Sequence, residues 1–182
     1  KESLYFDNFY PQVSAGTSSD TEFTFSSSLM PVQSGTVFVS YYNRSYITLQ
    51  TLLKEKGYYT FSMHGNKASM WNRNKMHPNL GYIDFYSQDY YTIDEEVGLG
   101  LSDHSFFKQS QSFIKDINTM VTEEKEFTNY MGTIITLSNH IPFMKDGVPF
   151  SDFDVTYHTG KKDELGNEII YDYLEKKNLA TM

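Results

Sequence analysis

The sequence predicts an α/β domain built on a mostly parallel β-sheet flanked by helices. Segments typical of strands and of helices alternate along the 182 residues, which is the order that parallel strands with connecting helices require. Residues 131–137 (MGTIITL) are almost wholly apolar, as expected for a central strand with both faces buried. Polar segments follow three of the predicted strands, at the edge where parallel sheets bind ligands. We expect these segments to converge on one ligand.

The first half of the chain is predicted to contain three strands and a helix. Residues 5–10 (YFDNFY) and 36–41 (TVFVSY) are strand-like because of their aromatic and β-branched content, and residues 58–63 (YYTFSM) form a third strand. Ser45 can cap a helix that ends at Gly57. The apolar face of this helix is expected to consist of Tyr46, Leu49, Leu52 and Leu53.

The second half is predicted to contain a short strand at residues 82–86 and a long helix capped by Ser102 or Asp103. The apolar positions of that helix are Phe106, Phe107, Phe113, Ile114 and Ile117. Residues 145–167 are polar and show no period, with Gly147, Gly160 and Gly166 as turn points, and residues 168–177 are predicted to form a last helix.

Composition excludes several classes of site. The chain has no cysteine, which rules out disulfides, thiolate metal sites and a cysteine nucleophile. Its net charge of -8 and the absence of a basic stripe disfavour nucleic-acid binding. No apolar run approaches the roughly 20 residues of a membrane span. The chain begins without Met and enters a predicted strand within a few residues, so we expect it to be a piece of a longer protein.

The tract GTSSDTEF at residues 16–23 carries three hydroxyl side chains, those of Thr17, Ser18 and Ser19. A strand, a glycine turn and hydroxyls that enter a helix can present a nucleophile where helix N–H groups hold a phosphate. From the tract alone, the same residues are more typical of a plain loop with a helix N-cap, and both interpretations stay open. Asp20 and Glu22 are expected to orient this turn and to favour the positive end of the helix.

Four further residues are candidates for binding. His64 follows a strand and can bind a metal or phosphate, or simply satisfy backbone carbonyls. Arg73 offers a planar fork suited to a phosphodiester and Trp71 can stack on a glycerol, although a surface arginine beside a core tryptophan is the alternative. His140 lies between a strand and Pro142 and is interpreted as functional. The other three histidines are interpreted as surface residues: His77, His104 and His158.

With these residues in place, the chain resembles the extracellular catalytic domain of the lipoteichoic acid synthase family, which are phosphoglycerol transferases of the sulfatase and alkaline phosphatase superfamily. The resemblance covers about residues 5–143. It rests on motifs in the family's order: NFY with GTSSDTEF, SGTVFV, GYYTFSMHGNKASMWNR, GYIDFY, GLSDHSFFKQS and TLSNHIPF. It implies an alkaline phosphatase- or sulfatase-like fold, incomplete at both ends. Residues 1–182 would form a partial catalytic domain, of which 1–143 match the family and 144–182 match less well.

The resemblance implies a two-step transfer of glycerophosphate. A hydroxyl bound to a manganese ion attacks the phosphodiester of phosphatidylglycerol, releases diacylglycerol and leaves a glycerophosphoryl enzyme. The terminal glycerol hydroxyl of the growing polymer then takes up the group. The family's catalytic threonine falls on Ser18, one residue after Thr17, and Ser18 would also be a metal ligand. The family's substrate-binding positions fall on His64, Trp71, Arg73 and His140.

The resemblance also implies what this chain lacks. The family's other metal ligands, a glutamate on an early strand and an Asp-His pair on a late strand, have no counterpart in the 182 residues. One hydroxyl cannot hold a divalent ion, since such sites need several ligands. We therefore expect the isolated chain to be inactive and metal-free, with manganese or another divalent metal bound in the longer parent. Asn66 replaces an aspartate found in many members, which would alter hydrogen bonds to the headgroup.

The implied partners are the headgroup of phosphatidylglycerol and the glycerophosphate polymer of lipoteichoic acid in the cell wall. The implied location is the extracellular face of the bacterial membrane, within a membrane-anchored parent whose anchor is absent here. A sheet that lacks its first and last strands exposes edges, which favours an edge-paired oligomer.

Other functions remain open at this stage. A sulfatase-like hydrolase is the nearest alternative, although the formylglycine signature is absent. Transfer to a different glycan acceptor is also open, because none of the motifs contacts the acceptor. From a different class, the chain could be a non-catalytic module that binds glycerophosphate polymer through Arg73, Trp71 and the histidines.

Overall fold

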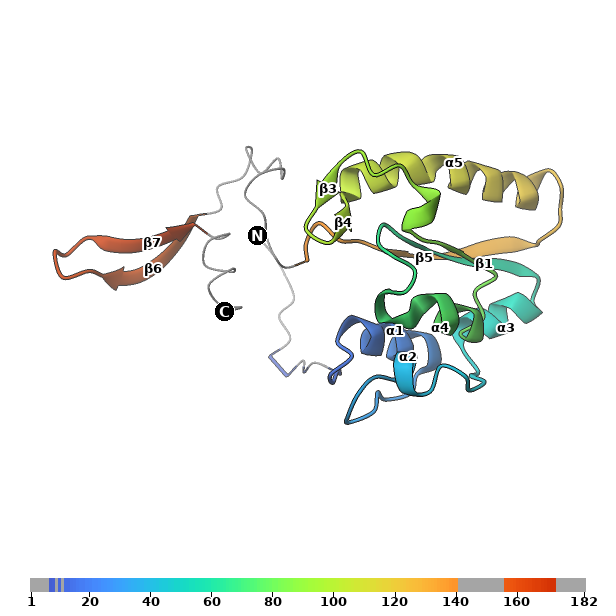
Figure 1. Cartoon of the computed structure of the whole chain (residues 1–182), viewed down its shortest axis with the longest axis horizontal. Coiled ribbons are helices and arrows are strands. Elements are labelled where there is room, and N and C mark those ends of the chain that lie inside the picture. Colours follow the sequence, from blue (N-terminus) through green and yellow to red (C-terminus); the bar gives the residue numbers. More distant parts are fainter. Residues whose placement is uncertain (1–6, 9, 11, 141–155, 173–182) are drawn as a thin grey trace. The chain divides into compact units, whose positions relative to one another are not determined.

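The computed structural model of the chain describes residues 7–8, 10, 12–140 and 156–172 (Figure 1). These residues divide into two compact units. The first unit comprises Lys1–Met63, Ala68–Tyr86 and Ile114–Ile134, and the second comprises His64–Lys67, Ser87–Phe113 and Ile135–Met182. The predicted strand at residues 5–10 and the predicted turn point Gly147 lie largely or wholly outside the described residues.

Helices and strands alternate along the chain as expected. The helices are α1 Ser18–Ser27, α2 Val37–Ser40, α3 Leu49–Glu55, α4 Arg73–Asn79 and α5 Asp103–Thr122, with 3-10 turns η1 Met70–Asn72 and η2 Gln88–Tyr90. The strands are β1 Tyr58–His64, β2 Asp84–Tyr86, β3 Glu96–Val97, β4 Gly100–Leu101, β5 Asn129–Ile135, β6 Thr156–Lys162 and β7 Glu168–Asp172. None of the described helices is long and apolar enough to cross a lipid bilayer.

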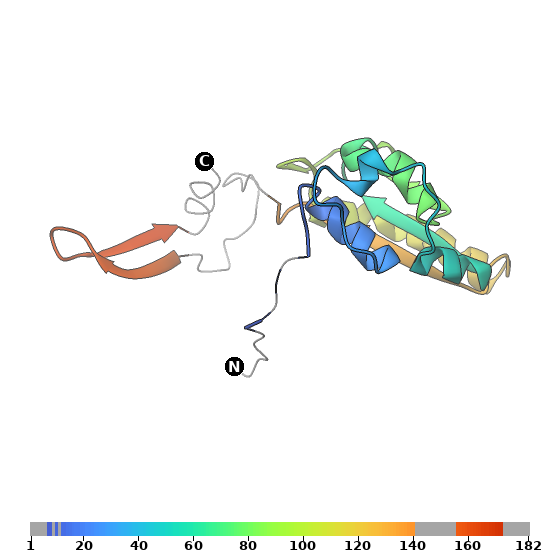
Figure 2. The same ribbon diagram turned by 90° about the horizontal axis from the view of Figure 1, so that it is seen from below.

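The main sheet has the strand order β2-β1-β5. β1 pairs in parallel with β2, with Phe61 opposite Asp84 and Met63 opposite Tyr86. Within the first unit, α1 to α4 cover one face of β1, while the C-terminal half of α5 lies on the other (Figures 1 and 2). The predicted α/β class, a parallel sheet flanked by helices, is therefore confirmed.

The buried central strand is β1, not the segment at residues 131–137. β1 is buried at every position after Tyr58. β5 lies at the edge of the three described strands, and its exposed and half-buried positions alternate, with Ile134 exposed. The prediction for 131–137 was wrong in burial because apolar residues can cover one face of an edge strand without being enclosed on both.

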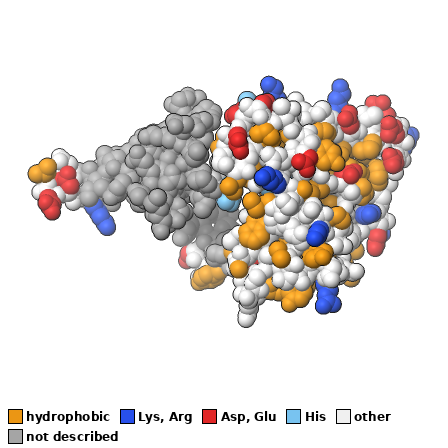
Figure 3. Space-filling model, viewed as in Figure 1, with side chains coloured by type: hydrophobic (Ala, Val, Ile, Leu, Met, Phe, Trp, Pro, Cys, Tyr) orange, Lys and Arg blue, Asp and Glu red, His pale blue; other side chains and the backbone are white. Residues whose placement is uncertain are grey.

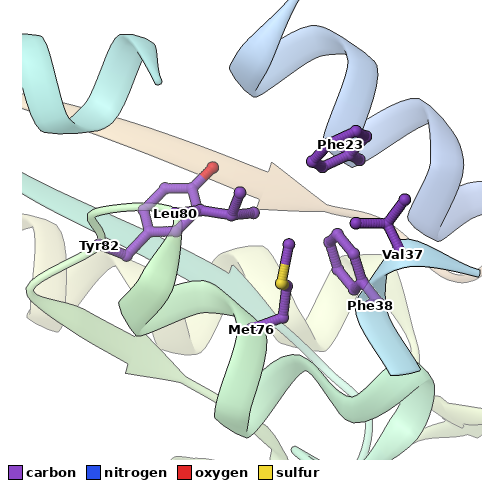
Figure 4. Close-up of a cluster of buried hydrophobic side chains, with 6 residues drawn as sticks. All are labelled: Phe23, Val37, Phe38, Met76, Leu80 and Tyr82. Carbon is purple, nitrogen blue, oxygen red and sulfur yellow. The ribbon is translucent and has the colours of Figure 1, made fainter. Parts of the chain in front are cut away.

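The core of the first unit lies between α1, α2 and α4 (Figure 4). Its six buried side chains are Phe23, Val37, Phe38, Met76, Leu80 and Tyr82. The predicted strand at residues 36–41 is wrong, since Thr36 caps α2 by accepting a hydrogen bond from the backbone N–H of Phe38 at 3.3 Å. The helix lets the consecutive residues Val37 and Phe38 both enter this core, whereas a strand would turn them to opposite faces.

The helix predicted from Ser45 exists, but it begins later. Thr48 caps α3, and Thr48 and Thr51 form a reciprocal capping box. The predicted end is confirmed, because Gly57 follows the helix with a φ of 81°. The predicted apolar face is wrong: Leu52 is 50% exposed, and the fully buried residue of α3 is Gln50. The amide of Gln50 donates to the Tyr82 hydroxyl at 2.9 Å, so this face of α3 contacts the core residue Tyr82 through a hydrogen bond.

The second unit contains the predicted cap of the long helix. Ser102 precedes α5, and its hydroxyl accepts a hydrogen bond from the backbone N–H of Ser105 at 3.1 Å. Phe106 of this helix is buried, and its ring centroid lies 5.2 Å from that of Tyr91. The helix predicted at residues 168–177 is wrong, because Glu168–Asp172 forms β7, paired antiparallel with β6. The β-branched pair at the start of this segment suits a hairpin strand, and Gly166, with a φ of 86°, supplies the turn.

The surface carries no continuous basic region on the face drawn in Figure 3. There, lysine and arginine side chains are scattered among acidic and apolar ones. This distribution agrees with the net charge of -8.

Candidate functional site

The tract GTSSDTEF forms a strained turn that leads into α1. Thr17 precedes the helix with φ 41° and ψ -103°, a backbone conformation that is rare for a β-branched residue. The backbone N–H of Ser19 donates to the carbonyl of Gly16 at 2.9 Å and closes the turn. Backbone strain of this kind costs free energy and is concentrated at functional sites in proteins.

The three hydroxyls of the tract have different surroundings. Thr17 and Ser18 are exposed, so both predicted nucleophiles are accessible to a substrate. Ser19 is fully buried, and its hydroxyl contacts the carbonyl of Gly16 and the hydroxyl of Thr36, each at 2.8 Å. Ser19 is therefore a structural residue of the turn.

Asp20 holds the turn in place, as predicted. This fully buried carboxylate accepts hydrogen bonds from the backbone N–H groups of Ser14, at 2.8 Å, and Gly16, at 3.0 Å. The packing leaves no room for a side chain at position 16, where a Cβ would lie 2.2 Å from Oδ1 of Asp20. Gly16 is required here by space, and Asp20 links the turn to the first turn of α1.

Arg73 is buried and paired with Glu22, although the two lie 51 residues apart in sequence. Only 2% of the arginine is exposed. Its Nε donates to both carboxylate oxygens of Glu22 at 3.1 Å, and its Nη2 donates to Oε1 at 2.5 Å. Nη1 makes a longer contact, 3.4 Å, with the carbonyl of Met70. The interpretation of Arg73 as a surface residue is therefore wrong.

Glu22 also contacts His77, which was predicted to lie on the surface. That prediction was wrong: His77 is 1% exposed, and its Nε2 lies 3.1 Å from Oε2 of Glu22. Burial lowers the pKa of His77 and outweighs the opposing effect of Glu22. Because the carboxylate can only accept, the neutral ring donates from Nε2, and its Nδ1 accepts from the hydroxyl of Ser62 at 2.8 Å.

The pKa of Glu22 is set by opposing effects. Burial alone would raise it, but the hydrogen bonds from His77 and Arg73 and the charge of Arg73 outweigh burial, so the pKa is lowered. Glu22 is therefore a carboxylate at neutral pH. With His77 neutral, the cluster of Arg73, Glu22 and His77 carries no net charge.

Ser62, His77 and Glu22 are linked in the order of a hydrolase triad, but they cannot act as one. The hydroxyl of Ser62 is on the central strand and is fully buried, as is the histidine ring. A nucleophile must reach its substrate, so this chain of hydrogen bonds serves to fix Glu22.

Trp71 lies beside Arg73 in a second strained segment. Trp71 and Asn72 both have positive φ angles, 54° and 58°, before α4 begins at Arg73. The side-chain amide of Asn72 donates to the carbonyl of Phe38 at 2.8 Å, which secures this turn. Trp71 is half-buried against the core of the first unit, so it both packs and retains an accessible part.

The other two predicted binding residues belong to the second unit, whereas Ser18, Trp71 and Arg73 belong to the first. His64 ends β1, is 2% exposed, and its Nδ1 donates to the carbonyl of Ile135 at 2.9 Å. His140 is exposed, and its backbone N–H donates to the carbonyl of Leu137 at 2.8 Å. Of the two remaining histidines, His104 is exposed as predicted, and the side chain of His158 lies outside the described residues.

The described part of the chain contains no group of three or more His, Asp or Glu side chains placed to hold a metal ion. Asp20 and Glu22 are engaged with backbone N–H groups and with Arg73 respectively, so neither joins Ser18 in a ligand set. These residues do not fit the expected manganese ion, and no chemical step is derived through it.

Sequence patterns missed the pairing of Glu22 with Arg73 and the burial of His77. One local signal was available: Ser18 and Glu22 are four residues apart, which puts them on the same face of a helix. The spacing places a carboxylate one turn after the candidate nucleophile, on the same side of α1.

Known proteins resemble this chain in sequence over most of its length. A family model described as Sulfatase matches residues 1–178. Lipoteichoic acid synthase 2 of Bacillus subtilis (strain 168) is 32% identical over 176 residues, which cover 96% of this chain and 24% of that protein. The lipoteichoic acid synthase of Staphylococcus aureus (strain USA300) is 34% identical over 149 residues, 80% of this chain and 22% of that protein. The chain thus spans about a quarter of these curated relatives.

Solved structures share the fold. The crystal structure of the lipoteichoic acid synthase LtaP from Listeria monocytogenes has a TM-score of 0.71 and 23% identity, and the match covers 96% of this chain and 41% of that one. The Streptococcus pyogenes phosphoglycerol transferase GacH in complex with sn-glycerol-1-phosphate has a TM-score of 0.50 and 22% identity, with coverage of 70% and 33%. The sulfatase-like form of the α/β fold is confirmed by these likenesses.

Proposed function

Because this chain belongs to the sulfatase family and groups within it with the lipoteichoic acid synthases, we propose that its protein is a phosphoglycerol transferase. The protein would move glycerophosphate from phosphatidylglycerol to a glycerophosphate polymer, the lipoteichoic acid chain, or to a glycan acceptor. The ligand named for GacH, sn-glycerol-1-phosphate, supports this substrate class.

One observation carries the proposal. Ser18 is exposed at the start of α1, and Glu22, one turn later on the same helix face, holds Arg73 through two nitrogens. Cβ atoms at this spacing lie roughly 5–6 Å apart. This arrangement supports a site near the positive end of the helix, where the Ser18 hydroxyl would attack a phosphodiester and Arg73 would bind it through the donors that Glu22 leaves unused.

The chemistry divides into two displacements at phosphorus. In the first, Oγ of Ser18 forms a bond to phosphorus, the bond to the diacylglycerol oxygen breaks, and the proton of the serine passes to that oxygen. In the second, the terminal glycerol hydroxyl of the acceptor bonds to phosphorus, and Ser18 leaves and regains a proton. Arg73 would donate hydrogen bonds to the phosphoryl oxygens in both steps.

The remaining residues would bind the headgroup. Trp71 would stack on the glycerol carbons, whereas the roles of His64 and His140 in headgroup binding rest on the resemblance alone. Manganese, or another divalent metal, would be bound in the longer parent. Its ligands other than Ser18 would have to come from beyond these residues, so we propose that the 182-residue piece alone is inactive. The site would work at the extracellular face of a bacterial membrane, in a membrane-anchored protein.

Covalent trapping tests the nucleophile. The full-length protein is incubated with phosphatidylglycerol that is labelled in its headgroup glycerol, quenched and digested, and the labelled peptide is identified by mass spectrometry. We expect the label on Ser18, its loss in Ser18→Ala, and its retention in Thr17→Ala, the matched neighbour. Label on Thr17 would reverse the assignment of the nucleophile. Release of labelled glycerol phosphate to water alone would indicate a hydrolase, and binding without any label or turnover would indicate a silent module.

A further inference from the structure

Glu22 binds the guanidinium of Arg73 along one edge. Nε and Nη2 face Glu22, at 3.1 Å and 2.5 Å from Oε1. An arginine has five N–H donors, and the hydrogen bonds to Glu22 and to the carbonyl of Met70 occupy three of them. Among the described residues, one N–H on Nη1 and one on Nη2 are left for a ligand. These two nitrogens form a second edge, with the spacing that binds two oxygens of one phosphate.

Glu22 is itself held from several sides, so it fixes the orientation of the Arg73 guanidinium. It belongs to α1, and its Oε2 accepts from Nε2 of His77. His77 is fixed in turn by Ser62 on the central strand, at 2.8 Å, and by ring contact with Phe85, whose centroid lies 4.6 Å away. All of these residues belong to the first unit. A helix, a strand and the α4 histidine therefore determine the plane of the guanidinium.

Free rotation would be costly for an arginine that binds a phosphate. The side chain has several rotatable bonds, and fixing them at the time of binding costs free energy. A guanidinium that is already held by a carboxylate avoids this cost, and the buried pair needs no further desolvation of its bonded edge.

We propose that Glu22 is a positioning residue of the transfer site, which orients Arg73 so that its Nη1 and Nη2 edge receives the phosphodiester. The inference rests on the proposed function, since it takes Arg73 as the phosphate-binding residue. It adds a role for Glu22, and for His77 as its support. Neither residue touches the substrate.

Binding of sn-glycerol-1-phosphate and turnover of phosphatidylglycerol by the full-length protein test this role. Glu22→Gln keeps the shape of the side chain but is uncharged, and it replaces one oxygen with an NH2 group that cannot accept from Nε of Arg73 or from His77. We expect it to weaken binding or raise KM by about tenfold or more, since small misplacements of binding groups cost up to ~100-fold. Glu22→Asp keeps the charge and should recover part of the loss.

A double-mutant cycle separates positioning from general structural support. If Glu22 acts through Arg73, Glu22→Gln will have less than about a twofold further effect in an Arg73→Gln background, because coupled residues are not additive. If Glu22 only stabilises the fold, the two effects will multiply, and the proposal is overturned. Thermal unfolding of each variant shows which ones remain folded at the assay temperature.

An independent readout is the NMR signal of the Arg73 Nε–H group. A guanidinium held by Glu22 should give a sharp signal protected from exchange, and Glu22→Gln should broaden it or remove the protection. If the wild-type protein binds sn-glycerol-1-phosphate and Glu22→Gln binds it with the same affinity, the positioning role is overturned and the proposed function stays intact. A wild-type protein that neither binds nor turns over the substrates would refute the proposed function, and the positioning role with it.

Discussion

Gly16→Ala is the substitution with the clearest expected effect, because neighbouring atoms leave no room for a side chain at position 16. The added Cβ would lie 2.2 Å from Oδ1 and 2.6 Å from Cγ of Asp20, and 2.7 Å from the hydroxyl oxygen of Thr36. To reach an ordinary contact, the carboxylate must retreat by about 1 Å, which stretches its hydrogen bonds to Ser14 and Gly16 beyond useful length.

The magnitude follows from those two hydrogen bonds. Each joins a backbone N–H to a buried carboxylate, and such bonds contribute about 1.5–3 kcal/mol. Losing one fully and weakening the other should lower the free energy of unfolding by about 3 kcal/mol. The opposing gain, a less flexible unfolded chain, is only about 0.4–1 kcal/mol.

Urea unfolding of wild type, Gly16→Ala, Asp20→Ala and the double variant measures the effect and its cause. We expect Gly16→Ala to cost less in the Asp20→Ala background, because the clashing carboxylate is absent there and only the close contact with Thr36 remains. A single variant that unfolds within about 0.5 kcal/mol of wild type, which is the range of neutral surface changes, would refute the steric reasoning.

Three further predictions concern the buried cluster and the core. Arg73→Ala should lower the free energy of unfolding by about 3–5 kcal/mol, since Glu22 keeps a buried charge without its partner; Glu22→Leu in the same chain should restore part of this loss in urea unfolding. Stability should fall as the pH drops below 6.5, because burial keeps the pKa of His77 below this ordinary value, so the unfolded chain binds the proton first. The lowered pKa of Glu22 adds a second loss of stability below pH 4.5. When unfolding is followed across pH, a His77→Gln variant should lack the loss that begins below pH 6.5. If this variant keeps the wild-type dependence of stability on pH, the argument is contradicted. Phe38→Ala should cost about 3–5 kcal/mol, because this core ring is fully buried, whereas Leu52→Ala, at a half-exposed site, should cost less than about 1 kcal/mol; equal losses in denaturant would contradict the packing described.

Local sequence was sufficient where the energy that selects a structure is itself local. Ser102 before α5 and Gly57 after α3 are examples, because a cap or a left-handed turn depends on the residue and its immediate neighbours. The strand 58–63 was predicted for the same reason, since its β-branched and aromatic residues favour an extended backbone in many settings.

The failures occurred where distant parts of the chain decide. Residues 36–41 have strand-like composition, but α2 buries Val37 and Phe38 together against α1 and α4, and this packing outweighs the local preference. Residues 131–137 are apolar enough for a central strand, yet their place at the edge of the described sheet depends on which neighbours pair with β1.

The sequence by itself determined the class of fold, the hydroxyl tract that contains Ser18, and the ordered motifs that mark the family. Only the tertiary structure decided that Arg73 forms an ion pair with Glu22 and that His77 is buried in contact with that glutamate. The physical reason is distance along the chain. An arginine has no partner until folding brings a carboxylate to it, and here that carboxylate comes from a helix 51 residues away.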